Sequence, residues 1–428
     1  GCRVMKYIII GACAAGLSVA ESIRKNDKDG EVTIITREAF LPYSRPSISY
    51  YLKGKVTQSD MLLRKPAYYK QNNINVITST EVKAIDINAK TVKAGRKTYS
   101  YDKLCLATGS KPFVPPMKNV EGKANVFTFL DLQSAKDVKK AADENTRAVV
   151  IGGGLIGMKA AEGLSKICKS VDVVEFAPRI LPSILDEKSA KYVKKYIEEQ
   201  GNIKFHLQNT IVEAKSKGKT IKSVILKSGK ELKCDMLVVA VGVRPETVLA
   251  ENAGLKVDRG IITNDQTMQT SAPDVYACGD CCVSTDMLDG SRKIIALWPN
   301  AVQQGRVAGS QMSGGNETIG GTYSVNAIDF YGLRICTCGL INAQGDEYFD
   351  KVKQNGDEYK RLIFKDDLLV GFVLINSSTN AGIYTNLISN KVSLSTVSGD
   401  IMATPTVFMF DKATRTQKLV GNKEGVKL

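Results

Sequence analysis

The sequence contains one histidine, His206, and one tryptophan, Trp298, among 428 residues. A Ser-His-Asp hydrolase or a histidine-rich metal centre would have to be built around that one histidine, so both classes are disfavoured. The longest apolar run, Tyr7–Ala20, contains two glycines and is shorter than the roughly 20 residues that span a bilayer. We therefore expect no membrane span and no metal site.

The ten cysteines are scattered along the chain and do not have the spacing of a small disulfide framework. We expect free thiols and a cytoplasmic protein. Cys278 and Cys281 form a C-x-x-C pattern, but no second pair of ligands has metal spacing, so we interpret these residues as packed side chains.

Acidic residues are scarce relative to basic ones: Lys and Arg number 59 and Asp and Glu number 44, which gives a net charge of +15. No motif supports nucleic-acid binding. Two interpretations of the charge remain, namely general solubility and a basic face that steers an acidic protein partner.

The first distinctive motif is a glycine-containing loop between an apolar run and a helical pattern. Tyr7–Ile10 is suited to a buried strand, and Gly11 to Gly16 follows at once. A strand, a tight turn and a helix N-terminus are what a dinucleotide pyrophosphate requires. Cys13 stands where the middle glycine is usual, so alone this match is weak.

A second copy of the motif is complete. Ala148–Ile151 predicts a strand, and Gly152, Gly154 and Gly157 occupy all three glycine positions. Glu175 ends the next predicted strand, 18 residues after Gly157. A carboxylate there accepts hydrogen bonds from a ribose 2′-OH and repels a 2′-phosphate, which favours NADH; Arg179, four residues on, leaves some NADPH use open. Two loops imply two nucleotides, and a nicotinamide donor with a flavin is the simplest pair.

With these loops the chain resembles the FAD-dependent pyridine nucleotide–disulfide oxidoreductase superfamily. Further segments strengthen the resemblance: Leu104–Gly109 (LCLATG), Leu237–Pro245 (LVVAVGVRP), Thr270–Asp280 (TSAPDVYACGD) and Trp298–Gly305 (WPNAVQQG), in the family's order. It covers about residues 5 to 345. It implies that Asp280 holds the flavin ribitol and that the helix from Trp298 points its N-terminus at the flavin.

Within the superfamily, Leu41–Ser49 (LPYSRPSIS) resembles rubredoxin reductases, ferredoxin-reductase-like proteins and the flavin portion of nitrite reductases. Related disulfide reductases and NADH oxidases carry a redox cysteine near Arg45, and this segment has none. The chain also departs from the family pattern at two positions. Lys159 replaces a glutamate and Tyr50 replaces a lysine, with Lys53 nearby, so the usual lysine–glutamate pair is missing or rearranged. Glu38 is the candidate for the FAD adenosine ribose.

The resemblance implies the following site residues. The flavin-side catalytic candidates are Arg45, Lys53, Lys159 and Trp298. The FAD candidates are Gly11, Cys13, Ala14, Ala15, Gly16, Glu38, Arg45, Ala107, Thr108, Gly109, Gly279, Asp280 and Trp298. The NAD candidates are Gly152, Gly154, Leu155, Ile156, Gly157, Glu175 and Gly242.

The expected fold is α/β, with two Rossmann-like dinucleotide-binding domains and a C-terminal α+β interface domain. The expected boundaries are residues 5–112 and 244–320 for FAD, 113–243 for NAD, and 321–428 for the interface domain. Residues 359–364 and 368–374 predict strands around a hairpin, and residues 380–388 predict a helix. We expect the Lys-rich tail from Lys418 to be solvated.

The expected function is transfer of electrons from NADH through FAD to an external acceptor, either an acidic rubredoxin- or ferredoxin-like carrier or a partner subunit. Two alternatives stay open: a peroxide-forming NADH oxidase or quinone reductase, and an NADH-sensing interaction protein. The sequence is compatible with a homodimer.

Overall fold

The computed structural model describes residues 3–377 and 381–420. The chain divides into two compact units. The first unit runs to Pro178 and resumes from Asn202 to Thr322, and the second contains Arg179–Gly201 and the chain from Tyr323 onward. The expected three-domain boundaries stay a prediction, but this division groups residues 179–201 with the C-terminal chain.

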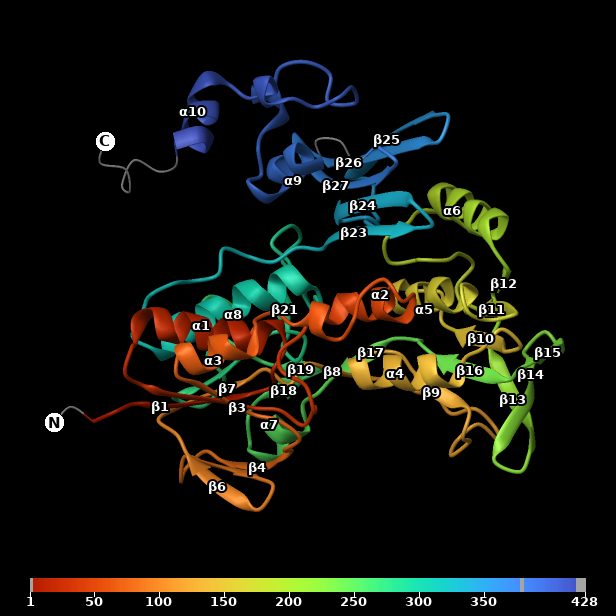
Figure 1. Ribbon diagram of the computed structural model, residues 1–428. Helices are drawn as coiled ribbons and strands as arrows, with labels where there is room; N and C mark the ends of the chain where they lie inside the picture. Colours follow the sequence, from red (N-terminus) through yellow and green to blue (C-terminus); the bar gives the residue numbers. More distant parts are fainter. Residues whose placement is uncertain (1–2, 378–380, 421–428) are drawn as a thin grey trace. The chain divides into compact units, whose positions relative to one another are not determined.

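The first unit contains two parallel five-stranded sheets, each the centre of what we call a lobe (Figure 1). The first-lobe sheet has the order β20 (Val275–Ala277), β7 (Lys103–Leu106), β1 (Lys6–Ile10), β2 (Glu31–Ile35) and β3 (Ile74–Ile77). Tyr7–Ile10 of β1 is buried throughout, as expected for a central strand between two covered faces.

Helices and short sheets complete the first lobe. Its helical segments are α1 (Ala14–Asn26), η1 (Arg45–Ser47), α2 (Ile48–Leu52), η2 (Ser59–Met61), α3 (Pro66–Gln71), α7 (Val248–Asn252) and α8 (Trp298–Met312). Its antiparallel strands are β4 (Val82–Asp86), β5 (Thr91–Ala94), β6 (Lys97–Ser100), β18 (Val257–Asp258), β19 (Gly260–Ile261), β21 (Ser284–Thr285) and β22 (Arg292–Lys293).

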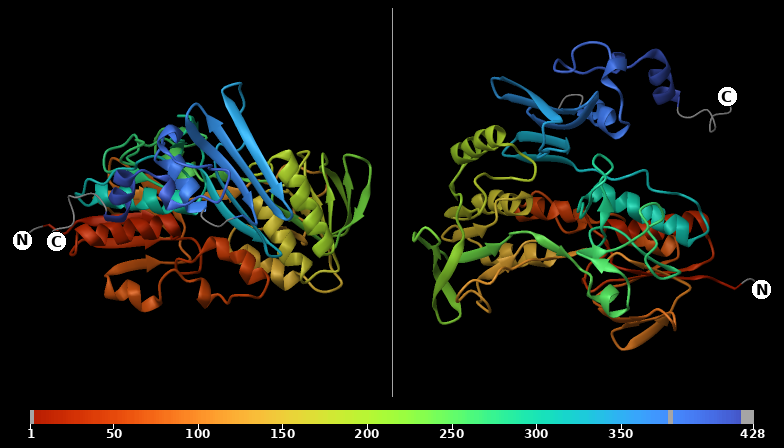
Figure 2. Two further views of the ribbon diagram at one scale, coloured as in Figure 1. Left: turned by 90° about the horizontal axis from the view of Figure 1, so that it is seen from above. Right: turned by 180° about the vertical axis from the view of Figure 1, so that it is seen from behind.

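Helices α1 and α8 run side by side (Figures 1 and 2). A Cβ atom on Gly305 would lie 2.4 Å from the carbonyl oxygen of Ala15, and one on Gly309 would lie 2.4 Å from that of Val19. Glycine at both positions therefore allows the two helix backbones to touch.

The second-lobe sheet has the order β12 (Ile203–His206), β11 (Ser170–Val174), β10 (Arg147–Ile151), β16 (Met236–Val239) and β9 (Val126–Thr128). Helices α4 (Leu132–Ala141) and α5 (Leu155–Ser165) pack beside it, and β13 (Ile211–Lys217), β14 (Thr220–Leu226) and β15 (Glu231–Lys233) form an antiparallel sheet. The two chain crossings between the lobes, β8 (Ser110–Pro112) and β17 (Val243–Pro245), pair with each other.

The second unit is built on an antiparallel sheet. Its order is β23 (Val325–Phe330), β24 (Leu333–Gly339), β27 (Leu368–Ile375), β26 (Glu358–Lys365) and β25 (Tyr348–Asn355). Its helical segments are α6 (Glu187–Gln200), α9 (Ala381–Ser389), η3 (Leu394–Thr396), η4 (Val407–Met409) and α10 (Lys412–Val420). The helix predicted over residues 380–388 is present as α9, although residue 380 lies outside the described residues.

Helix α6 belongs to this unit through polar contacts with the sheet and its turns. Asp186 caps the helix by accepting from the Ser189 N–H, and it also accepts from the hydroxyl of the buried Tyr359 at 3.1 Å. Tyr196 donates to the carbonyl oxygen of Tyr331 at 3.0 Å. The segment between β11 and β12 is therefore tied to strands more than a hundred residues later.

The predicted α/β fold with paired parallel sheets and a C-terminal domain is confirmed. Helix α10 extends into the tail, which we had expected to be solvated from Lys418; residues after 420 lie outside the described part. Among the residues described, none of the helices combines the length and the apolar character needed to cross a membrane.

Candidate functional site

The first glycine loop joins β1 to α1 at the carboxyl end of the first-lobe sheet. Gly11 has φ +111°, and a Cβ on it would lie 2.0 Å from the carbonyl oxygen of Ala107. A Cβ on Gly16 would lie 2.0 Å from the carbonyl oxygen of Gly11. Both glycines are thus required by contacts within the protein, and α1 begins at Ala14 with its first N–H groups directed at the loop.

Cys13 is the N-cap of α1, and it does more than fill space. Its side chain makes no capping hydrogen bond, but its sulfur lies 3.3 Å from Arg45 Nε, which donates to it. Burial raises the pKa of the Cys13 thiol, and the Arg45 charge opposes that shift. The thiol therefore stays protonated at neutral pH.

Arg45 also joins a carboxylate network at this loop. Its Nη2 donates to Glu38 Oε2 at 2.6 Å, and the Tyr43 hydroxyl donates to Glu38 Oε1 at 2.6 Å. The same hydroxyl accepts from the Leu132 N–H at the start of α4, in the second lobe, at 3.0 Å. Glu38 keeps unused lone pairs, since a carboxylate offers about four, so it can still accept from a ribose.

Asp280 follows β20 and lies largely enclosed at the same edge of the sheet. Burial raises the pKa of its carboxyl, with Arg45 acting in the opposite direction. Within the described part of the chain no hydrogen bond to its carboxylate is found. The preceding residue, Gly279, is fixed by its N–H, which donates to Gln304 of α8 at 2.8 Å.

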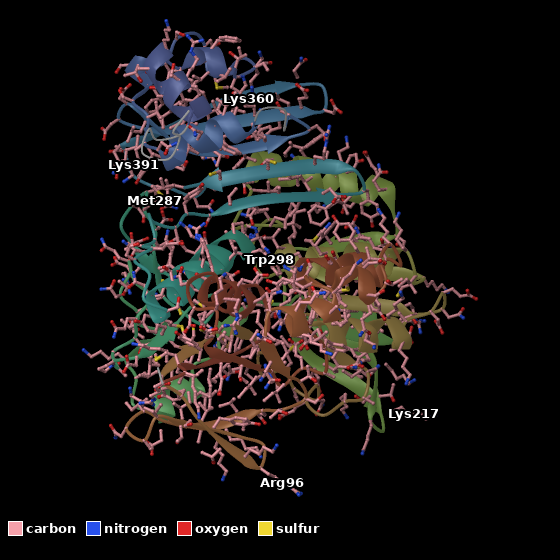
Figure 3. All side chains as sticks on the ribbon, turned by 60° about the vertical axis from the view of Figure 1, so that its left-hand side comes forward. Arg96, Lys217, Met287, Trp298, Lys360 and Lys391 are labelled. Atoms are coloured by element: carbon pink, nitrogen blue, oxygen red, sulfur yellow. The ribbon has the colours of Figure 1, made fainter. Side chains whose placement is uncertain are left out.

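Trp298 is the first residue of α8 and is half-buried against the apolar core of the first lobe (Figure 3). Its helix packs on α1, whose N-terminus carries the glycine loop. Two helix N-termini and a largely enclosed carboxylate that accepts no hydrogen bond from the described residues suit a ligand with phosphates and hydroxyls, which is the chemistry of FAD.

The residues that lead into the crossing between the lobes follow β7, the strand that pairs with β1. Ala107 supplies the carbonyl against which Gly11 packs, and Thr108 Oγ1 donates to the carbonyl oxygen of Glu246 at 2.7 Å. Gly109 has φ +66° and accepts from the Glu246 N–H. These contacts hold the two crossing strands together.

The second glycine loop repeats the geometry of the first. Gly152 has φ +114°, and a Cβ on it would lie 2.0 Å from the carbonyl oxygen of Ala240; one on Gly157 would lie 1.9 Å from that of Gly152. Gly154, the N-cap of α5, faces open space. Protein packing therefore accounts for the outer glycines but not for Gly154, whose open side would leave room for a bound pyrophosphate. Leu155 and Ile156 begin α5, and Gly242 has φ +124° after β16.

Glu175 is oriented by two backbone groups. Its carboxylate accepts from the Gly153 N–H at 2.5 Å and from the Ala177 N–H at 2.6 Å. Arg179, which we considered as a 2′-phosphate ligand, donates instead to the carbonyl oxygen of Leu185 at 2.9 Å and to Asn342 Oδ1 at 3.1 Å.

The two lobes meet where α2 packs on α5, a contact that we call the seam (Figure 1). Lys53 Nζ, just after α2, lies 2.6 Å from Glu162 Oε2 on α5, and both side chains are only 4% exposed. Lys159 Nζ lies 3.1 Å from the same oxygen. The lysine–glutamate pair expected to be missing or rearranged is thus rearranged, with each partner one helical turn further along its helix.

The remaining candidates from the sequence are structural. The nine described cysteines are free thiols. Cys281 is fully buried and contacts the carbonyl oxygen of Cys278 at 3.3 Å, and Cys278 lies 3.6 Å from Cys105, sulfur to sulfur. His206 pairs with Asp172 at 2.7 Å. The described residues hold no group of three or more His, Cys, Asp or Glu side chains placed to bind a metal.

Comparison with known proteins identifies the family. Residues 5–305 match the family model described as pyridine nucleotide-disulphide oxidoreductase. The chain belongs to this oxidoreductase family. Residues 325–392 match the rubredoxin NAD+ reductase C-terminal domain.

Individual relatives agree with the assignment. An NADH oxidase of Methanocaldococcus jannaschii is 38% identical over 72% of this chain and 70% of its own length. A rubredoxin-NAD(+) reductase of Pseudomonas putida is 28% identical over 88% of this chain and 97% of its own. A crystal structure of the ferredoxin reductase for the CYP199A2 system from Rhodopseudomonas palustris has a TM-score of 0.84, with 25% identity over 94% of this chain and 98% of that chain.

This family uses FAD and NAD(H), so the chain is an FAD-dependent NADH oxidoreductase that passes electrons to an external acceptor.

The sequence analysis did not identify Tyr43, Glu162 and Gln304 as candidate site residues. Tyr43 could have been found, because it lies within the segment Leu41–Ser49 that resembles the family. No sequence pattern indicated Glu162, because its partner Lys53 lies far away in the sequence.

Proposed function

We propose that the first lobe holds FAD, that the second holds NADH, and that electrons leave to a small acidic electron-carrier protein. The observation that carries the acceptor assignment is the flavin-side segment Leu41–Ser49, which contains no cysteine. The thiol that contacts Arg45, that of Cys13, has its pKa raised by burial, which disfavours a reactive thiolate there. A disulfide acceptor reduced through a protein thiol would need a reactive cysteine beside the flavin. The match of residues 325–392 to a rubredoxin reductase domain supports the same acceptor class.

The residues of the chain have separate tasks in this proposal. The α1 N-terminus binds the FAD pyrophosphate, Glu38 accepts from the adenosine ribose, and Asp280 accepts from ribitol hydroxyls. A bound FAD would supply the chemistry of accepting a hydride from NADH and releasing electrons singly or in pairs. The α5 N-terminus and Glu175 bind NADH and orient it across the seam.

The positive charge of the chain supports an acidic partner. Arg96 and Lys217 lie at the tips of two hairpins of the first unit, one in each lobe (Figure 3). A protein with net charge +15 attracts an acidic carrier from a distance and raises the encounter rate. We propose the cytoplasm as its location, because buried free thiols persist there.

Turnover with two acceptors as a function of salt tests this proposal. With an acidic rubredoxin or ferredoxin, turnover should fall by about tenfold or more between low and high ionic strength, because salt screens charges beyond about 8–10 Å. With a small neutral quinone it should change by less than about twofold. Replacing Cys281 or Cys282 with alanine should leave both activities in place.

Other outcomes favour the alternatives. A flat salt response with oxygen as the best acceptor would instead indicate an NADH oxidase, which is the activity by which the Methanocaldococcus jannaschii relative is named. Slow turnover with every acceptor would favour the NADH-sensing interaction protein. Loss of acceptor reduction in a cysteine variant that retains FAD would refute the thiol-free route.

A further inference from the structure

A polar cavity of the first lobe is formed by none of the residues that we assign to a dinucleotide. Its volume is about 400 Å³, which is within the usual range of small-molecule sites. Nine residues between Lys256 and Pro273 line it, and none of the nine is aromatic. Lys256 comes just before β18, and the other eight belong to the segment that leads from β19 into β20.

The cavity also differs in position from the proposed FAD site. Strands β20, β7 and β1 are parallel, and the first glycine loop follows the carboxyl end of β1. Gly279 and Asp280 follow the carboxyl end of β20, whereas the lining residues Ser271–Pro273 precede its amino end. A ligand bound in this cavity would therefore be additional to the two dinucleotides.

Thr263 is the residue that points to a ligand in the cavity. It is only 6% exposed, and its hydroxyl makes no hydrogen bond with any residue that the structure describes. Thr270 lines the same cavity and is 8% exposed, but its hydroxyl donates to the carbonyl oxygen of Val275 at 2.8 Å. Because a buried hydroxyl without a partner is costly, an acceptor in the cavity would stabilise Thr263.

Other polar groups of the cavity are also available as donors. Lys256 forms no ion pair with the acidic residues in the described part of the chain, and nearby Asp258 lies 3.9 Å from Arg259 instead. The side-chain oxygen of Asn264 accepts from two backbone N–H groups, which leaves its NH₂ group free to donate. The Ser271 oxygen accepts from the backbone N–H of Lys256 at 2.9 Å, so its hydroxyl hydrogen is available as well.

The charges beside the cavity do not oppose an anion. Asp274 comes directly before β20 and is paired with both Lys90 at 2.7 Å and Lys103 at 2.5 Å. Asp265, the other acidic residue next to a lining residue in the sequence, does not itself line the cavity. The ammonium group of Lys256 is therefore the charge that a ligand would meet, and neutral donors surround it.

We propose that this cavity binds a small hydroxyl-rich ligand with one anionic group, either a phosphate ester or a carboxylate. Such a ligand is a sugar phosphate or a sugar acid. Lys256 and Thr263 bind the anionic group, and the amides of Asn264 and Gln269 bind hydroxyl groups. The cavity is larger than an inorganic anion requires, and a nucleobase would find no aromatic ring to stack on. The inference does not depend on where FAD and NADH bind.

The test is isothermal titration calorimetry on the purified holoprotein, in phosphate-free buffer with NAD⁺ present so that the ligands do not occupy its site. The probes are ribose 5-phosphate, ribonate, neutral ribose and inorganic phosphate. Ribose 5-phosphate or ribonate should bind with a Kd below about 1 mM and at least about tenfold more tightly than ribose or inorganic phosphate. The tighter of the two probes identifies the anionic group.

Variants of the lining residues locate the binding. K256Q should weaken it by about tenfold and T263V by about fivefold, because each removes a donor, whereas T263S keeps the hydroxyl and should bind as the wild type does. K227Q removes an exposed lysine charge from the turn after β14 and is the matched control. An unchanged FAD absorbance spectrum checks that each variant is folded.

Three results would overturn the inference. The first is that neither anionic probe binds, and the second is that ribose or inorganic phosphate binds as tightly as they do. The third is equal affinity in K256Q and K227Q, which would place the binding elsewhere on the protein. None of these results bears on the proposed electron transfer, which the response of turnover to salt tests separately.

Discussion

Glu175 is a side chain that we propose serves both the fold and nucleotide choice. Its carboxylate is already oriented by the N–H groups of Gly153 and Ala177, so it would lose little entropy on accepting from a ribose hydroxyl. A 2′-phosphate at the same place would meet a fixed negative charge. The basic residue that could offset that charge, Arg179, is engaged elsewhere.

We therefore predict that the protein reduces its flavin at least about tenfold more efficiently with NADH than with NADPH, since a charged hydrogen bond contributes about 1.5–3 kcal/mol. Glu175→Ala should remove most of this preference, as measured by stopped-flow reduction with each nucleotide. Arg179→Ala is the control and should leave the ratio unchanged. Equal efficiencies in the wild type would show that Glu175 does not choose the nucleotide.

At the residue scale the sequence predicted what is local. Gly11, Gly16, Gly152 and Gly157 were recognised because the turn and the helix start lie within a few residues of each other. The partners of Glu38 were not recognised although Tyr43 and Arg45 lie only five and seven residues along the chain, because an irregular loop has no periodicity that predicts which of its side chains meet. The Lys53–Glu162 pair joins two lobes and leaves no pattern in the sequence.

The packed helix pair α1 and α8 sets the geometry of the proposed FAD site. Gly305 and Gly309 remove side chains from one face of α8, and the backbone of α1 fills that space. Both helices start at the proposed FAD site, so their separation fixes the distance between the pyrophosphate loop and Trp298.

Gly309→Ala should destabilise the protein although alanine favours a helix by about 1 kcal/mol over glycine. The new methyl would meet the carbonyl of Val19, and overpacking of this kind costs about 1–3 kcal/mol. The expected net result is a lower urea midpoint and weaker FAD retention. Gly320→Ala, at an exposed glycine with open space around it, is the matched control; a variant at Gly309 as stable as that control would show that α1 and α8 can separate freely.

The strands and helices of the two lobes were largely predictable, because apolar runs followed by glycine turns and helical periodicity mark them. The position of α6 was not predictable. Its amphipathic pattern is typical of a helix but does not indicate which sheet the helix packs on. The contacts that decide this join residues distant in sequence, namely Asp186 with Tyr359 and Tyr196 with Tyr331.

At the scale of the whole molecule, neither compact unit is one continuous stretch of the sequence, because residues 179–201 group with the chain from 323 onward. We predict that under mildly denaturing urea the amides of α6 lose protection from hydrogen exchange together with those of β26 and β27. Helices α4 and α5, which belong to the first unit, are the internal control and should exchange together with β10 and β11. Exchange of α6 together with β11 would show that the division by compactness does not describe cooperative unfolding.

The interleaved path of the chain limits how this protein can be recombined with its relatives. A single crossover near Thr322 would bring in a foreign C-terminal sheet but keep the recipient's α6, so Asp186 and Tyr196 would face a surface for which they were not selected. To transfer the whole second unit from one protein to another, two segments have to be exchanged together: residues 179–201 and the chain from 323 onward. We therefore expect a C-terminal domain transferred between reductases of this family to keep these contacts only when the helix is transferred with the sheet.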